Sequence, residues 1–340
     1  MIRGAFRSVL PFVVGIPLLA IAQAFVPQAY FLWIVTIGVN VVLAVSLNVV
    51  NGFTGQFSLG HAGFMAVGAY TAAKVSLAFA GVRIVGLPEV VSDQLAFAFA
   101  LAGGMGAAAL AGFLVGMPSL RLRGDYLAIV TLGFGEIIRS LIENTTVLGE
   151  ALGLQGLPKR TNVVWIGVSA LATIVMARRL AVSTQGRALF AIREDEIAAE
   201  AMGVDTTGYK VRAFTISAAY AGLAGGLVGH AIQMVTPAMF TFIRSIEVVV
   251  MVVLGGLGSV TGSILAAVVL GIAIEAFRNF QEYRMVVYAL LLVVLMLLRP
   301  QGILGTRELW DLRFFRRVPR PRPLAATPGG ASPTDVRDEP

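Results

Sequence analysis

The sequence predicts an all-α polytopic membrane protein with about ten transmembrane or re-entrant helices and a possible internal repeat. Of its 340 residues, 57% are hydrophobic and only 13% are charged, whereas ordinary soluble domains carry about a quarter charged residues. The mean hydropathy is +0.83, and several apolar runs are long enough to cross a bilayer. The 38 glycines are typical of membrane helices that pack closely together.

The predicted membrane segments are apolar runs separated by polar loops. They lie at residues 9–26, 30–50, 62–80, 94–117, 125–143, 162–177, 213–234, 247–257, 259–277 and 285–298. For the first segment a cleavable signal peptide is the alternative, but the membrane helices that follow it favour a retained span. Segment 247–257 is short, so crossing and re-entry both stay open for it.

The basic residues predict the orientation of the chain. With the N-terminus in the cytoplasm, the positive-inside rule is satisfied by Arg121, Arg123, the polar stretch 183–212 and the C-terminal arginines. Both termini are then cytoplasmic, and the residues that fall outside as an exception are Arg83, Lys159 and Arg160. The net charge of +7 is explained in this way without a nucleic-acid partner. We expect a transmembrane domain over 1–318 and a disordered cytoplasmic tail over 319–340, which is rich in Pro, Gly and Ala.

The polar stretch 183–212 is predicted to be a cytoplasmic coupling region. Its alternating basic and acidic side chains favour contact with water and protein over lipid. Ser183 or Thr184 can cap a helix, and Gly203 can end one in the left-handed conformation. A solvated connecting loop is the alternative, but the length and the capping signals favour one docking helix over 186–203.

Two Gly-rich interruptions, 51–63 and 254–263, stand out between apolar runs. Gly52 and Gly55 in the first match Gly255 and Gly258 in the second at the same spacing. Corresponding Gly-rich breaks in two halves of a membrane protein indicate an internal repeat with a pathway between the halves; because glycine is abundant here, chance is the alternative. The side chains that would supply polar groups to such a path are Asn51, Thr54, Gln56, Ser58 and His61.

Glu136 and Arg139 lie inside a predicted span, three residues apart and therefore on one helical face. An internal ion pair is one interpretation, and a carboxylate that binds a proton or substrate is the other. His61 and His230 are the only histidines, and neither has neighbours at ligand spacing. With no cysteine and no clustered ligands, the sequence predicts no metal site and no bound cofactor.

The sequence also lacks the motifs of common catalysts. It contains no phosphate-binding G-x4-G-K-[ST] loop, no H-E-x-x-H and no G-x-S-x-G. We therefore expect neither ATP binding by this chain nor enzyme activity.

Four blocks in the same order along the chain resemble the permease subunits of branched-chain amino-acid ABC importers, most closely the larger of the two permeases. The blocks lie at 46–73, 122–141, 186–205 and 252–263, and the resemblance extends over roughly 35–305. It implies a multi-pass subunit of the bacterial inner membrane. Its partners would be a homologous second permease, two ABC ATPases that bind the ATP, and a periplasmic substrate-binding protein.

The resemblance also implies roles for individual residues. The E-A-A-x3-G pattern of importer docking helices is matched by Ala198, Ala199 and Gly203, but Ile197 holds the expected acidic position and Glu196 lies one residue earlier. The residues expected to contact the ATPases are Arg187, Arg193, Glu194, Asp195, Glu196, Ala198, Ala199, Glu200 and Gly203. Those expected along the translocation path are Asn51, Gly52, Thr54, Gly55, Gln56, Ser58, His61, Gly255 and Gly258.

Other functions stay open at this point. Similar permeases carry urea, short amides or aromatic acids. An ion-coupled secondary transporter would need an intramembrane ion site, for which only Glu136 is a candidate. A scaffold subunit would need no pathway.

Overall fold

A computed structural model gives the structure of residues 12, 15–20, 23, 27–79, 88–120, 122, 124–276, 302, 303, 305 and 308. The chain divides into two units, Met1–Glu308 and Leu309–Pro340, and all described residues belong to the first. Several predictions therefore fall outside the described residues: the span 285–298, the tail 319–340, most of the span 9–26, Arg83, Arg121 and Arg123.

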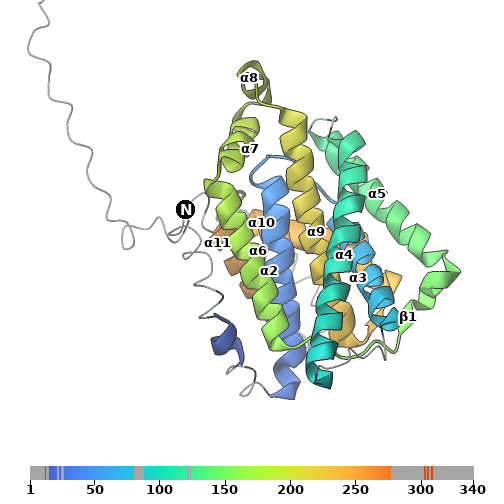
Figure 1. The fold of residues 1–340 in the computed structure, drawn as a ribbon. Helices are drawn as coiled ribbons and strands as arrows, with labels where there is room; N and C mark the ends of the chain where they lie inside the picture. Colours follow the sequence, from blue (N-terminus) through green and yellow to red (C-terminus); the bar gives the residue numbers. More distant parts are fainter. Residues whose placement is uncertain are drawn as a thin grey trace, which may run out of the picture. The chain divides into compact units, whose positions relative to one another are not determined.

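The described residues form a helical bundle (Figure 1). Its long helices are α2 (Phe31–Asn51), α3 (His61–Ala78), α4 (Glu89–Ser119), α5 (Asp125–Glu143), α6 (Val163–Val182), α9 (Thr206–Ile232), α10 (Phe242–Gly255) and α11 (Val260–Ala276). In the described part, five helical stretches are long and apolar enough to cross a membrane. The chain is therefore a polytopic helical membrane protein, as predicted.

Short elements connect the long helices. They are η1 (Gln28–Tyr30), η2 (Thr146–Leu148), η3 (Glu150–Leu152), α7 (Thr184–Glu194), α8 (Glu196–Ala201), η4 (Pro237–Phe240) and the strands β1 (Leu154–Gln155) and β2 (Met234–Val235). The two strands pair antiparallel, with Leu154 opposite Val235. They tie the loop before α6 to the loop after α9.

Helix α9 packs against α2, α3 and α4, and glycines allow the close approach. A Cβ atom on Gly104 of α4 would lie 2.6 Å from the carbonyl oxygen of Gly68 in α3. A Cβ atom on Gly222 of α9 would lie 2.8 Å from the carbonyl oxygen of Gly104. Small residues at these crossings let the backbones touch, which is how membrane helices gain packing energy without a hydrophobic force between them.

Helix ends were predicted well where apolar runs stop at polar residues, as for α5, and less well elsewhere. Helix α4 begins at Glu89 rather than at residue 94, because a carboxylate in the first turn suits the helix dipole. Helix α9 begins at Thr206 rather than at 213, because the Asp205 carboxylate accepts the Gly208 N–H at 3.0 Å and caps the helix.

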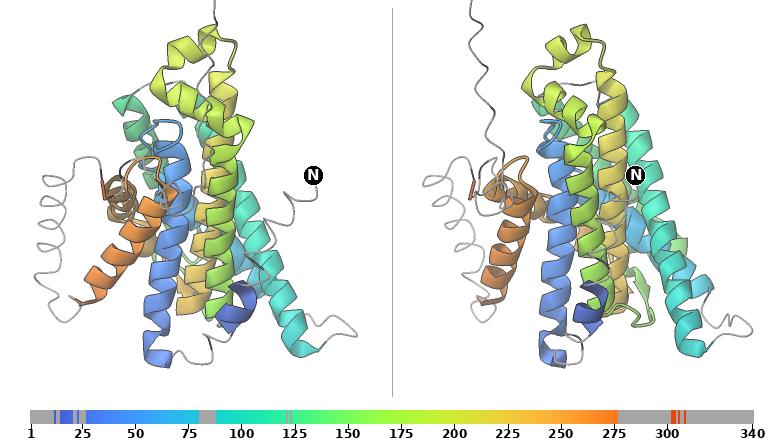
Figure 2. Two further views of the ribbon diagram at one scale, coloured as in Figure 1. Left: turned by 90° about the vertical axis from the view of Figure 1, so that its left-hand side faces the viewer. Right: turned by 60° about the vertical axis from the view of Figure 1, so that its left-hand side comes forward.

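The predicted single docking helix over 186–203 is wrong. The chain breaks at Asp195, which is extended (φ −157°) and whose carboxylate accepts the N–H groups of Ile197 and Ala198 at 2.9 and 3.0 Å. This cap starts a second helix in a new direction. Helices α7 and α8 together project beyond the end of the bundle (Figure 2), and Gly203 (φ +83°) then turns the chain back toward α9.

Candidate coupling and translocation site

The two Gly-rich turns lie against one another at the end of the bundle that carries α7 and α8. Asn48 of α2 joins them, because its side-chain oxygen accepts the Gly258 N–H at 2.9 Å and its amide donates to the Ser259 carbonyl at 3.0 Å. A side chain on Gly52 would overlap both Asn48 and the backbone nitrogen of Gly258. The turn after α2 and the turn after α10 therefore form one packed junction, named here the glycine junction (52–60 and 255–259).

The glycines that match in sequence also match in position. Gly52 caps the end of α2 and Gly255 is the last residue of α10. Gly55 and Gly258 both have positive φ, +71° and +91°, a conformation that side chains other than glycine rarely adopt. The two turns thus share a positive φ at this position, although Gly256 (φ +110°) adds a second one in the turn after α10 only.

The polar residues predicted for the path are buried inside this chain, each at most 8% exposed: Asn51, Thr54, Gln56, Ser58 and His61. The side chains of Asn51, Thr54 and His61 form hydrogen bonds within the turn or to α2. The Asn51 side chain accepts the Ser58 N–H at 3.2 Å, and His61 pairs with the Ser46 hydroxyl at 3.0 Å. None of these five lines a described pocket. Asn51, Thr54 and His61 thus stabilise the turn within this chain, and their place along the path stays a prediction.

Arg193 of α7 connects the coupling region to the glycine junction. Its guanidinium donates to the Gly52 carbonyl at 3.0 Å, and a Cβ atom on Gly258 would lie 2.8 Å from the same nitrogen. The guanidinium also binds Glu194 at 2.7 Å and lies over the Phe190 ring, which in turn packs on the buried Phe53. A single side chain therefore reaches both turns from outside the bundle.

Glu308 binds the start of α11, directly after the glycine junction. Its carboxylate accepts the N–H groups of Val260 and Thr261, at 2.6 and 3.1 Å, and the Thr261 hydroxyl at 2.6 Å. Ile303 also donates its N–H to the Leu254 carbonyl at 2.8 Å. A carboxylate at the first turn of a helix satisfies orphan N–H groups and suits the helix dipole, so this distant residue caps α11.

We expect Glu308→Ala to loosen the start of α11. Loss of a charged cap costs about 1–3 kcal/mol, so hydrogen exchange at Val260 and Thr261 should accelerate and thermal unfolding in detergent should begin earlier. Glu308→Gln is the matched control, because its amide oxygen retains part of the cap. Unchanged exchange at both amides in Glu308→Ala would contradict the role of this carboxylate.

The predicted ATPase-contacting residues divide by environment. Those exposed on α7, α8 and the following turn are Arg187, Glu194, Asp195, Ala198, Glu200 and Gly203. Ala199 is buried. Glu196 binds the ammonium of Lys210 in α9 at 2.6 Å, and the Lys210 side chain is only 3% exposed. Glu196 and Arg193 thus contact the bundle.

Two apolar residues of this region were not predicted to contact the ATPases. Ile197, in the first turn of α8, is 67% exposed, and Met202, which follows the last residue of α8, is 84% exposed. Apolar side chains exposed at the tip of a polar projection are candidates for a protein contact. The signal was present in the sequence, since both are large apolar residues among charged and small ones.

Charged side chains of α5 and α10 form ion pairs. Arg139 of α5 binds Glu136 at 2.8 Å and Glu143 at 2.9 Å, and the three side chains are 30–41% exposed. A second group escaped the sequence analysis: Arg244 of α10 binds Glu247 at 2.8 Å and the Asn40 side chain of α2 at 2.6 Å. The same i, i+3 spacing in both segments could have revealed it. Among the residues that the structure describes, no cluster of three His, Asp or Glu could hold a metal ion.

Comparison with known proteins identifies the family. The model of the branched-chain amino acid transport system permease component matches residues 29–296. The chain is 39% identical over 329 residues to the high-affinity branched-chain amino acid transport system permease protein LivM of Escherichia coli K12, covering 86% of this chain and 74% of that one. It is 40% identical over 301 residues to LivM of Salmonella typhimurium, covering 78% and 68%.

A second type of permease matches over a shorter stretch. LivH of Escherichia coli K12 is 36% identical over 149 residues, which is 43% of this chain and 47% of LivH. No solved structure matches the chain. The family model covers most of the chain, so this protein belongs to the family of branched-chain amino acid transport permeases.

Proposed function

We propose that this chain is one permease subunit of an ABC importer, that it pairs with a homologous second permease, and that it imports branched-chain amino acids delivered by a periplasmic binding protein. Separate ATPases bind the ATP and dock on α7 and α8. The observation that carries the proposal is the direct contact of Arg193 with Gly52 at the glycine junction, because a coupling element has to touch the helices that it moves.

Force from the ATPases enters at the exposed tip of α8 and leaves by two contacts. The Glu196–Lys210 pair links α8 to α9, and Arg193 links α7 to the turn after α2. Within the junction, the Asn51 amide nitrogen and the Gln56 carbonyl oxygen are buried without a hydrogen-bond partner among the described residues. Buried polar groups without partners are costly. These two groups could form hydrogen bonds in a second conformation of the turn, which would favour a switch between two states.

The translocation path is proposed to lie at the boundary between the two permeases, along α5. The Glu136–Arg139–Glu143 group is half-exposed in this single chain. Charges exposed to hydrocarbon are expensive, so such groups face protein or a water-filled cavity. The positive φ shared by Gly55 and Gly258 supports an internal repeat whose turns position helices beside that path.

The substrate is tested by uptake. In bacteria without their own branched-chain uptake, the chain and its neighbouring transport genes should restore accumulation of labelled leucine. Excess isoleucine or valine should compete, whereas urea, acetamide and benzoate should not. Accumulation of urea, an amide or an aromatic acid in place of leucine would assign the permease to another ligand class.

We also expect α7 and α8 to face the cytoplasm and the β1 loop to face the periplasm. Thr207 and Gln155 are both exposed, and the chain has no native cysteine. An impermeant thiol reagent added to intact spheroplasts should label Gln155→Cys and should label Thr207→Cys only after permeabilisation. The reverse labelling pattern would contradict the proposed orientation, in which both termini are cytoplasmic.

A further inference from the structure

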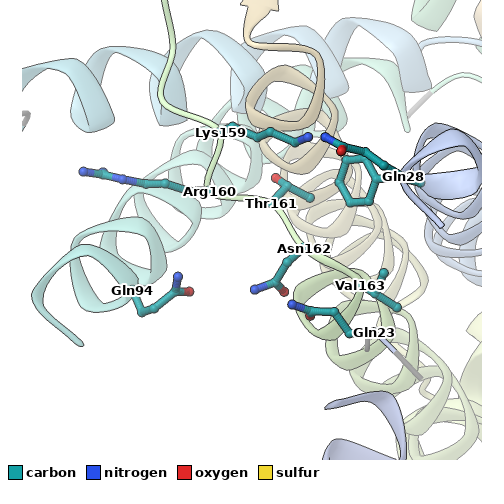
Figure 3. A pocket seen from close by; sticks show the side chains of 9 residues that line it. Gln23, Gln28, Gln94, Lys159, Arg160, Thr161, Asn162 and Val163 are labelled. Carbon is teal, nitrogen blue, oxygen red and sulfur yellow. The ribbon is translucent and has the colours of Figure 1, made fainter. Parts of the chain in front are cut away.

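A pocket lies at the end of the bundle opposite α7 and α8. It is about 310 Å³ in volume and is lined by the start of α2, by α4 and by the residues that lead into α6 (Figure 3). Helix α6 begins at this pocket and ends at α7. The pocket is therefore at the opposite end of the bundle from the glycine junction.

The pocket walls present hydrogen-bond donors. Lys159 contributes an ammonium, and Gln28, Gln94 and Asn162 contribute carboxamides. The oxygens of two of these amides are already engaged: Gln94 accepts from the Trp165 indole at 2.5 Å, and Asn162 accepts the Trp165 N–H at 2.9 Å. Their NH2 groups thus stay available, and a set of donors beside a cation suits an anionic oxygen ligand.

Lys159 is a charge with no ion pair among the described residues to account for it. Its neighbour Arg160 has a structural role, because it binds Asp93 at 3.0 Å and the Ser76 hydroxyl at 3.2 Å. Lys159 instead places its ammonium 4.8 Å from the centre of the Phe31 ring, and it forms no ion pair within the described residues. In Figure 3 Lys159 extends toward Gln28, whereas Arg160 extends in the opposite direction. A basic residue at this end also runs against the inside bias of positive charge.

The surroundings place the pocket at the level of lipid headgroups. Tyr30 and Trp33 flank Phe31, pack edge to face with centroids 5.1 Å apart, and are exposed. Exposed aromatic pairs of this kind mark the membrane–water interface. Leu32 and Leu95, each next in the chain to a lining residue, are exposed as well and provide an apolar surface for acyl chains.

We infer that this pocket binds the phosphate of an anionic phospholipid headgroup, with Lys159 as the charged contact and the Gln94 and Asn162 amides as donors. Basic pockets between membrane helices hold such headgroups on the cytoplasmic or matrix side, and the same donor chemistry is present here at the opposite end. The lipid would lie against Leu32 and Leu95 and would bridge α2, α4 and α6 at the end of the protein remote from the ATPases.

The full-length chain, reconstituted in nanodiscs of phosphatidylcholine with a minor fraction of phosphatidylglycerol, tests the inference. Lipid that stays bound after transfer to mild detergent is counted by native mass spectrometry. The unaltered protein should retain phosphatidylglycerol in preference to phosphatidylcholine. Lys159→Gln should retain about fivefold less phosphatidylglycerol than the unaltered protein, as expected for the loss of one lysine near a membrane surface.

Two controls separate loss of the site from loss of the fold. Lys159→Arg preserves the charge and should retain the lipid. Lys74→Gln removes a lysine from α3, outside the pocket, and should also retain it. Equal retention by Lys159→Gln and the unaltered protein would overturn the inference.

Two further measurements distinguish a lipid headgroup from a soluble anion and from a protein partner. Inorganic phosphate at millimolar concentration should fail to displace the retained lipid; displacement together with phosphate binding in lipid-free detergent would make the pocket a site for a soluble anion. Binding of the substrate-binding protein should be the same for Lys159→Gln and the unaltered chain. If that binding falls while lipid retention is unchanged, the pocket contacts the protein partner instead, and the lipid assignment is wrong.

Discussion

Replacing both Ile197 and Met202 with aspartate is expected to abolish docking of the ATPases while the permease itself folds normally. Both side chains are mostly exposed in the single chain, so the change costs the fold little. At a docked interface each apolar anchor contributes about 1.5–3 kcal/mol, and a buried, unpaired carboxylate adds a further penalty. The affinity for the ATPase should therefore fall by about a hundredfold or more.

Co-purification and surface plasmon resonance of the reconstituted permease pair with purified ATPase measure this loss. Leu152→Asp is the matched control, since Leu152 is equally exposed at the opposite end of the bundle; it should leave the affinity unchanged. Glu200→Gln should weaken binding by less than about 1 kcal/mol, as is usual for an exposed charge. Full affinity in the double aspartate variant would show that the ATPases dock elsewhere.

The sequence predicted the membrane helices because lipid imposes a simple rule. Apolar runs bounded by polar residues mark helices directly, as for α5, whose ends the structure gives as Asp125 and Glu143. The rule weakens where a side chain is polar yet buried. Lys210 lies inside α9 because Glu196 neutralises it, and that partner comes from another helix.

The break between α7 and α8 could not be predicted from helix propensity alone. Asp195 is compatible with a helix interior, but its carboxylate satisfies two N–H groups better as a cap. The choice between one long helix and two short ones depends on where Arg193 and Phe190 are seated, which is a tertiary contact.

The path residues illustrate a different limit. The sequence pattern of a polar side chain within a Gly-rich break is the same whether that side chain lines a channel or stabilises a turn. Asn51 and His61 close the turn in this chain. Asn48, which joins the two turns, lies in a run of apolar residues and carries no local signal of its partner, because Gly258 is distant in sequence.

Replacing Arg193 with alanine is expected to uncouple ATP hydrolysis from transport while the ATPases still dock. The substitution removes the guanidinium from the Gly52 carbonyl and from Glu194 but leaves Ile197 and Met202 in place. A charge-assisted hydrogen bond contributes about 1.5–3 kcal/mol. The coupling equilibrium between ATPase docking and the glycine junction should therefore weaken by about tenfold to a hundredfold. Basal hydrolysis by the assembled complex should persist, while its stimulation by ligand-loaded binding protein and the uptake of leucine should be lost.

The measurement is ATP hydrolysis and uptake in proteoliposomes, with and without loaded binding protein, for matched amounts of assembled complex. Arg193→Lys should be intermediate, because an ammonium reaches one acceptor but lacks the planar fork. Arg212→Ala is the control, since Arg212 stacks on Tyr209 of its own helix. Ligand stimulation that survives in Arg193→Ala would leave the Glu196–Lys210 pair as the remaining link from α8 into the bundle. Loss of docking together with stimulation would instead show that Arg193 positions the α7–α8 projection as a whole.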